Sequence, residues 1–203
     1  MDKISLLGCG YLGFPLALKL FEKGYCVKGS TRSPVKFNQL KNSGIIPYLI
    51  DVDNMESLDF FESDILVLTL PFKRTFIDPK VYKEQIKTIC DKVRVSSIRH
   101  IVFTSSSSVY PKNNIEYLPT DNFIPVNTRS KILLECEEIL NRLEKISVAT
   151  IRLGGIYGFG RVIKKSVKPR RLVPHEEALK LIENGINKIG SSSCINGFKS
   201  LVM

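Results

Sequence analysis

No apolar run in the sequence approaches the roughly 20 residues that a helix needs to span a bilayer, which argues against a membrane partner. The start, Met1-Asp2-Lys3 and a short apolar run, lacks the pattern of a signal peptide. Cysteines are few, scattered and odd in number, and form no CxxC pair, which argues against a disulfide framework or a metal site. They are Cys9, Cys26, Cys90, Cys136 and Cys194. We expect reduced thiols in a cytoplasmic globular protein that holds no metal.

Internal repeats and low-complexity tracts are absent as well. The 203 residues are 43% hydrophobic and 25% charged, which is typical of a soluble globular protein. A chain of this length is by default one domain that buries a sizeable core.

The net charge of +10 is concentrated in one segment, 161–171, which has no acidic residue. Without its six basic residues the net charge would be +4. Such a run either attracts an anionic substrate or a nucleic acid, or is simply solvated. We favour the solvated reading and consider nucleic acid unlikely, because no aromatic residues interleave the charges. The basic residues are Arg161, Lys164, Lys165, Lys168, Arg170 and Arg171.

The most informative stretch is GCGYLG (8–13), which follows the apolar run 4–7 and precedes apolar residues at helical spacing. A GxGxxG between a strand and a helix is typical of a dinucleotide site, although a tight turn without a ligand has the same pattern. Gly8 would allow the turn and Gly10 would let the backbone approach a pyrophosphate. Gly13 would let the helix pack closely on the strand. The intervening Tyr11 and Leu12 are counted with the cofactor-binding residues.

Strands and helices alternate along the chain. This alternation predicts an α/β fold with a Rossmann-like, doubly wound parallel sheet and helices on both faces. The expected strands are 4–7, 25–29, 45–50, 64–70, 99–104 and 147–152, and the expected helices are 11–23, 34–42, 81–95, 128–144 and 175–187. We divide the chain into a dinucleotide-binding domain, 1–160, and a short basic C-terminal segment, 161–203, whose tail from 190 shows no clear periodicity.

The end of the second expected strand bears on the choice of cofactor. An acidic residue there selects NAD by binding the ribose 2′-hydroxyl, whereas an arginine accommodates the 2′-phosphate of NADP. The strand ends in Ser30, Thr31 and Arg32, and no acidic residue follows until Asp51. Arg32 can pair with a phosphate and the hydroxyls can donate to it. We therefore prefer NADP to NAD, the alternative being an arginine on a solvated loop.

A second informative stretch is TSSSSVYP (104–111), at the carboxyl end of the fifth expected strand, where open α/β sheets place ligands. Ser105 is a candidate cofactor-binding residue. Ser106 and Lys131, which is 25 residues later, are candidates for polarising a substrate carbonyl and orienting a ribose. The plain alternative is a serine-rich loop and a solvated lysine.

Several segments together resemble the short-chain dehydrogenase/reductase superfamily, and more closely the atypical branch of the NAD-dependent epimerase/dehydratase (nucleoside-diphosphate-sugar epimerase-like) proteins. The segments are GCGYLG (8–13), STRSP (30–34), DILVLTLP (64–71), IRHIVFTSSSSVY (98–110), PVNTRSKILLECEE (125–138) and IRLGGIYGFGR (151–161).

The resemblance implies roles for individual residues. Ser106 matches the family's catalytic Ser/Thr. Lys131 matches the lysine of YxxxK, which binds the nicotinamide ribose and lowers the pKa of the catalytic tyrosine. Leu70 and Pro71 would border the adenosine and ribose. The 154–158 segment, which includes Tyr157, would lie near the nicotinamide.

Two departures from the family are as informative as the match. Asn127 stands where YxxxK has its tyrosine, and an asparagine side chain neither takes nor gives a proton in the relevant range. Tyr110 and Tyr157 are candidate substitutes, though the family places the first away from the hydride path. The chain after Gly158 is also shorter than in most family members, which predicts either a reduced substrate lobe or a truncated gene product. His175 beside Glu176 at a helix start is expected to be exposed rather than a catalytic base.

Three functions compete on this evidence. The first is an NADP(H)-binding oxidoreductase or epimerase-like protein acting on a sugar nucleotide or another small carbonyl or hydroxyl substrate. The second is a catalytically inactive dinucleotide-binding sensor. The third is a nucleic-acid binder using 161–171. The resemblance also implies a possible homodimer through helices 81–95 and 128–144.

Overall fold

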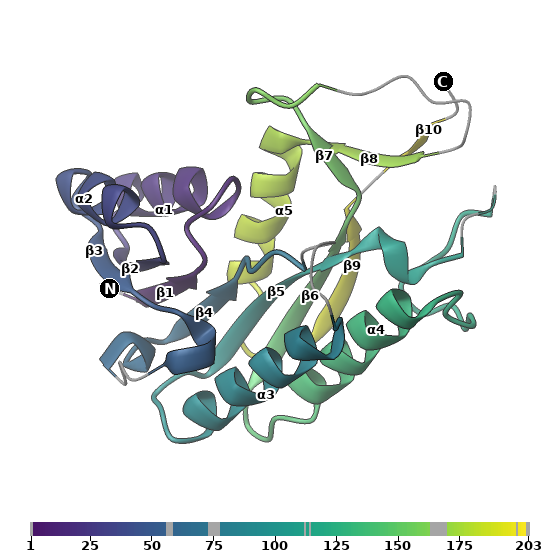
Figure 1. The fold of residues 1–203 in the computed structure, drawn as a ribbon, viewed down its shortest axis with the longest axis horizontal. Helices are drawn as coiled ribbons and strands as arrows, with labels where there is room; N and C mark the ends of the chain where they lie inside the picture. Colours follow the sequence, from purple (N-terminus) through teal and green to yellow (C-terminus); the bar gives the residue numbers. More distant parts are fainter. Residues whose placement is uncertain are drawn as a thin grey trace.

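The computed structural model describes residues 2–55, 59–72, 78–111, 113, 115–162, 170–197 and 199–201. Its centre is a seven-stranded sheet in the order β3-β2-β1-β4-β5-β6-β9, in which every neighbouring pair is parallel (Figure 1). The predicted Rossmann-like α/β fold is confirmed. The strands are β1 (Lys3–Leu7), β2 (Cys26–Thr31), β3 (Ile46–Leu49), β4 (Ile65–Leu68), β5 (His100–Ser106), β6 (Ser147–Leu153) and β9 (Ser193–Gly197).

Helices cover both faces of this sheet and divide the core in two. On one face, apolar side chains of α1, α2 and α5 pack against the strands, and on the other face those of α3 and α4 do so. Residues of β4 are apolar and buried throughout, as expected for a parallel strand covered on both sides. The helices are α1 (Gly13–Glu22), α2 (Pro34–Asn42), α3 (Lys80–Arg94), α4 (Thr128–Asn141) and α5 (His175–Ile186).

The chain beyond residue 160 contributes to the same sheet. Helix α5 packs on β5 and β6, and β9 pairs with β6, an arrangement the sequence did not predict. A small second sheet has the order β10-β8-β7 and lies beyond the N-terminal end of α5 (Figure 1). Its strands are β7 (Gly155–Tyr157), β8 (Arg170–Pro174) and β10 (Lys199–Leu201). The division into domains at residue 160 stays a prediction. Lys164, Lys165 and Lys168 of the basic run lie outside the described residues.

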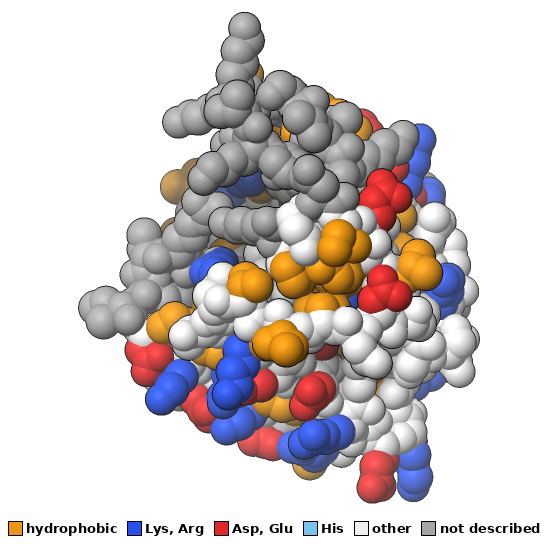
Figure 2. Space-filling view, turned by 90° about the vertical axis from the view of Figure 1, so that its right-hand side faces the viewer, with side chains coloured by type: hydrophobic (Ala, Val, Ile, Leu, Met, Phe, Trp, Pro, Cys, Tyr) orange, Lys and Arg blue, Asp and Glu red, His pale blue; other side chains and the backbone are white. Residues whose placement is uncertain are grey.

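Exposed hydrophobic side chains gather in the segment between β5 and α4. Figure 2 shows the face that carries this segment, with hydrophobic side chains near its centre. A patch of this kind is typical of surfaces that contact another chain. Helices α3 and α4, the candidates for a dimer surface, are joined by an ion pair between Lys83 and Glu135. The homodimer stays a prediction. The exposed residues of the segment are Ile115, Leu118, Ile124 and Val126.

Among the helices that the structure describes, none has the length and apolar character needed to cross a membrane.

His100, at the start of β5, is fully buried beneath α5. Its Nε2 lies 2.9 Å from the Gly185 carbonyl oxygen, and because a carbonyl only accepts, Nε2 carries the hydrogen. Nδ1 therefore accepts the hydrogen of the Ser147 hydroxyl, 2.6 Å away. Burial lowers the pKa of His100, although the bonds to Gly185 and Ser147 oppose the shift.

This arrangement predicts a loss of stability in acid. The unfolded chain takes up a proton on His100 as the pH falls through about 6.5, whereas the folded chain, with its lower pKa, resists protonation. We expect the free energy of unfolding, measured by urea denaturation, to fall between about pH 7.5 and about pH 5.5. The fall should be smaller in His100→Gln, whose amide does not titrate. The same pH dependence in both proteins would contradict this account.

Candidate functional site

A cavity of about 710 Å³ opens at the carboxyl ends of the central strands. The strand order reverses between β1 and β4, and open α/β sheets bind ligands at such a point. The predicted residues that line the cavity are Gly8, Gly10, Tyr11, Leu12, Thr31, Arg32, Leu70, Pro71, Ser105 and Ser106. Within the described chain, Gly13 and Lys131 are the predicted residues that do not line it.

The glycine-rich loop has the geometry that each glycine was predicted to allow. Gly8 has a φ of +106°, a conformation that side-chain-bearing residues rarely adopt. A Cβ at position 13 would lie 2.3 Å from the Gly8 carbonyl oxygen, so only glycine lets α1 pack this closely. A Cβ at position 10 would meet no atom nearer than 4.0 Å, so the space in front of Gly10 is open for a ligand.

The loop is fixed by the strands on either side of β1. The Gly8 N–H donates to the Ser30 hydroxyl at 2.9 Å, and the Cys9 N–H donates to the Ser30 carbonyl at 2.7 Å. On the other side, the Thr69 hydroxyl donates to the Gly8 carbonyl at 2.7 Å. Burial raises the pKa of the Cys9 thiol to about 12, so Cys9 is a packing residue rather than a nucleophile. No side chain caps the N-terminus of α1.

The cavity wall beyond β2 combines both signs of charge. Arg32 is exposed and lines the cavity with Lys36. Because β3 pairs in parallel with β2, Asp51 also reaches this wall, although 19 positions separate it from Arg32. The Asp51 carboxylate accepts the Asp53 N–H at 3.4 Å, which holds it in the turn after β3.

Ser105 and Ser106, the first two serines of the serine strip 105–108, make different hydrogen bonds. The hydroxyl of Ser105 donates to the buried Glu137 carboxylate at 2.5 Å. The hydroxyl of Ser106 accepts the N–H of Ser108 at 3.2 Å, and its own hydrogen has no acceptor among the described residues. Ser106 is therefore the member of the strip whose hydroxyl can still donate to a ligand in the cavity.

The resemblance to YxxxK implies that Lys131 of α4 faces the cavity, but a different side of the helix does so. Arg129 and Leu133, four residues apart and so on one face, line the cavity. Lys131 is exposed and lies about 200° around the helix from Arg129. The pKa of the Glu135 carboxyl is lowered mainly by its hydrogen bond to Lys83, and the charge of Lys131 adds a smaller effect. The structure therefore does not bring Lys131 together with Ser106, and Arg129 supplies the cation of α4 at the cavity.

Asn127 sets where α4 begins. It has an extended backbone, and its side-chain oxygen accepts the Ser130 N–H at 2.9 Å. This is the N-cap contact for which asparagine is preferred, and tyrosine has no group that reproduces it. The residue at the family's tyrosine position is thus a helix cap in this chain.

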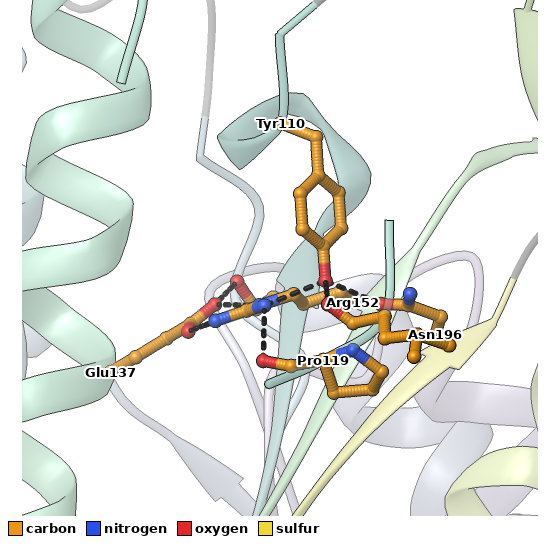
Figure 3. A network of polar contacts seen from close by, with 7 residues as sticks. Tyr110, Pro119, Glu137, Arg152 and Asn196 are labelled. Atoms are coloured by element: carbon orange, nitrogen blue, oxygen red, sulfur yellow. Dashed lines mark hydrogen bonds and ion pairs between the residues drawn. The ribbon is translucent and has the colours of Figure 1, made fainter. Parts of the chain in front are cut away.

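Neither candidate tyrosine is placed as a substitute acid. Tyr110 is fully buried beneath the serine strip and belongs to the polar network shown in Figure 3. Its hydroxyl accepts from Arg152 and donates to Asn196, both at 2.7 Å. Burial raises the pKa of Tyr110 despite the opposing effect of Arg152. Tyr157 is half-buried on β7 and does not line the cavity within the described residues.

A buried ion pair is the centre of that network. The guanidinium of Arg152 on β6 donates to the Glu137 carboxylate of α4 at 2.7 Å, with both side chains at least 90% buried. It also donates to the Pro119 carbonyl at 3.3 Å. Burial alone would lower the pKa of Arg152, but the hydrogen bonds and charge of Glu137 outweigh it and raise that pKa. The network joins α4, β6 and β9 beneath the cavity.

One expectation about the cavity mouth is wrong. His175 is 2% exposed rather than solvated. Its Nε2 donates to the Tyr11 carbonyl at 3.1 Å, and its ring lies edge-on to the Tyr11 ring, with centroids 4.8 Å apart. His175 is buried because α5 begins directly against the glycine-rich loop, a contact between distant parts of the chain. It does not line the cavity within the described residues.

No protein-family model matches the chain. Protein YeeZ from Escherichia coli K12 is 33% identical over 169 residues, which are 79% of this chain and 61% of YeeZ. The chain thus spans about three fifths of the length of this curated relative.

Solved structures with a similar fold include sugar-nucleotide epimerases. The UDP-N-acetylglucosamine 4-epimerase from Bacillus cereus has a TM-score of 0.80 at 18% identity, over 99% of this chain and 78% of that one. The UDP-glucuronic acid 4-epimerase from Bacillus cereus, in complex with UDP-glucuronic acid and NAD, has a TM-score of 0.79 at 15% identity, over 98% and 79%. At these identities the likeness shows the fold.

Some cavity residues were missed by the sequence analysis. Arg129 is one of these, and its spacing of four residues from Leu133 could have indicated that both lie on the helical face that lines the cavity. Asp51 and Arg161 reach the cavity only through pairing of strands that the local sequence does not reveal.

The buried pair gives a prediction about stability. Glu137→Gln leaves Arg152 buried without its carboxylate, and breaking one side of a buried pair costs about 3–5 kcal/mol. We expect that loss in the free energy of unfolding measured by urea denaturation. The matched control, Glu137→Met combined with Arg152→Met, should lose much less because no charge is left unpaired. A loss below about 1 kcal/mol, which is the scale of an exposed ion pair, would show that the two charges are not desolvated.

Proposed function

We propose that the protein binds a dinucleotide in the cavity at the carboxyl ends of β1, β2, β4 and β5, as an NADP(H)-binding, epimerase-like protein. The observation that carries the proposal is the glycine-rich loop. Gly13 brings the helix against the strand, Gly8 makes the turn, and Gly10 leaves space for a pyrophosphate in front of the uncapped start of α1. A bound cofactor would supply hydride-transfer chemistry.

The wall beyond β2 supports NADP over NAD. Arg32 and Lys36 line the cavity with the N-cap residue Ser33, and two cations beside a hydroxyl suit a 2′-phosphate. Asp51 on the same wall is the feature that favours NAD, because a carboxylate repels that phosphate and can accept from a ribose hydroxyl. The epimerase of similar fold is in complex with NAD, which makes NAD the alternative to test.

A substrate would lie beside Ser106, whose hydroxyl is free to donate to a carbonyl or hydroxyl oxygen. The proposed substrate class is a sugar nucleotide or another small carbonyl or hydroxyl compound. The similar fold of sugar-nucleotide epimerases supports the first of these. In this proposal Ser106 holds the oxygen, Arg129 supplies the nearby positive charge, and a water moves the proton.

A binding module without turnover is the second candidate, and specific observations favour it. The family's tyrosine position is a helix cap, Tyr110 is held in a buried network, and Lys131 lies outside the cavity lining. A protein built this way would bind the dinucleotide and report its presence without transferring a hydride.

The cofactor proposal predicts a selective effect of Arg32→Ala. Removing the guanidinium should weaken NADPH binding about tenfold, on the scale of one charge-assisted hydrogen bond, and leave NADH binding nearly unchanged. Titration followed by nucleotide fluorescence measures both. Asp51→Asn, as the matched change of opposite charge, should strengthen NADPH binding. Tighter binding of NADH than of NADPH by the unchanged protein would contradict the NADP preference, and binding of neither would contradict the site.

Turnover separates the two candidates. If the protein is an enzyme, a panel of sugar nucleotides and carbonyl compounds will include one that oxidises NADPH, and Ser106→Ala should lower that rate at least about tenfold. If it is a binding module, no compound will be turned over, even by Asn127→Tyr. Because that variant also loses the cap, costing about 1 kcal/mol, Asn127→Ala is its control for stability.

A further inference from the structure

The first residue of the basic run, although exposed, lines the cavity. Arg161 follows β7 and lines the cavity, and its guanidinium carbon is 3.5 Å from the centre of the Tyr11 ring. Among the described residues, no carboxylate pairs with this guanidinium and no acceptor takes its hydrogen bonds. The positive charge is therefore available to a ligand.

A tight turn holds Arg161 in this place. The N–H of Gly158 donates to the Arg161 carbonyl at 2.8 Å, and the N–H of Arg161 donates to the Gly158 carbonyl at 3.0 Å. Gly158, Phe159 and Gly160 all have positive φ, at +87°, +46° and +83°. The Tyr11 hydroxyl donates to the Gly158 carbonyl. One side chain of the glycine-rich loop thus both anchors the turn and carries Arg161 on its ring.

The position over Tyr11 faces the part of the cavity that suits phosphate. Tyr11 follows Gly10, in front of which the space is open. A guanidinium presents a rigid fork of N–H donors that matches phosphate oxygens, and stacking on an aromatic ring keeps it in place at small entropic cost.

We propose that Arg161 binds the diphosphate of a dinucleotide in the cavity, beside the glycine-rich loop, with Tyr11 and the 158–161 turn fixing its position. The inference rests on the proposed dinucleotide site and adds to it a charged residue from the turn that follows β7. The diphosphate of a sugar nucleotide has the same chemistry. The contact with Tyr11, inside the glycine-rich loop, favours the dinucleotide.

The test compares Arg161→Ala with the unchanged protein in titrations of NADPH, NADH, ADP-ribose and UDP-glucose. The first three share the dinucleotide diphosphate, so each should bind about tenfold more weakly to the variant. Arg32→Ala should instead affect NADPH alone. Arg142→Ala, which removes a 78% exposed side chain at the C-cap of α4, is the matched surface control and should leave binding of all four ligands unchanged.

A second measurement reports on the turn itself. The chain has no tryptophan, so Phe159→Trp places a single indole on the turn, at a residue that is 70% exposed. Saturating ADP-ribose should change the indole emission when Arg161 is present and should leave it unchanged in the variant that also carries Arg161→Ala.

The outcomes separate the two proposals. If the unchanged protein binds no dinucleotide, the proposed function fails and this inference fails with it. If it binds dinucleotides and Arg161→Ala binds them equally well, this inference alone is overturned. Weakened UDP-glucose binding with unchanged dinucleotide binding overturns it too, by assigning Arg161 to the other diphosphate. Equal weakening of the three dinucleotide-type ligands supports it.

Discussion

The site depends on how closely α1 approaches the end of β1. With a hydrogen in place of a side chain at Gly13, the backbone of the helix lies directly against the carbonyl of Gly8. That approach aims the uncapped start of α1 at the carboxyl end of the sheet. Ser30 and Thr69 then hold the loop from the two neighbouring strands, so the shape of the cavity is fixed by the sheet rather than by a ligand.

Much of the fold could be predicted from local patterns. Apolar runs bounded by glycine and proline gave six of the seven strands of the main sheet, and Ser33 before Pro34 marked the start of α2, where its hydroxyl accepts the Lys36 N–H. Strand β9 could not be predicted because its sequence, SCING, is only partly buried and lacks the apolar periodicity that reveals a strand. Its backbone hydrogen bonds to the edge of β6 stabilise it as a strand.

The site was harder to predict than the fold because it depends on helical phase and strand register. The cap at Asn127 fixes the first turn of α4 and with it which side chains face the cavity, so Arg129 rather than Lys131 reaches it. Similarly, the register of β3 on β2 brings Asp51 to the wall that Arg32 lines. The spacing of the YxxxK motif carries no information on either contact.

The pairing of β9 with β6 has a consequence for how the chain folds during synthesis. Residues 147–153 leave the ribosome some forty positions before residues 193–197, the strand that covers them. Until then β6 has an unpaired edge, and Asn196 has not yet reached the hydroxyl of Tyr110. An exposed edge strand is a template for pairing with other chains. Until β9 pairs with it, β6 is therefore open to pairing with another chain.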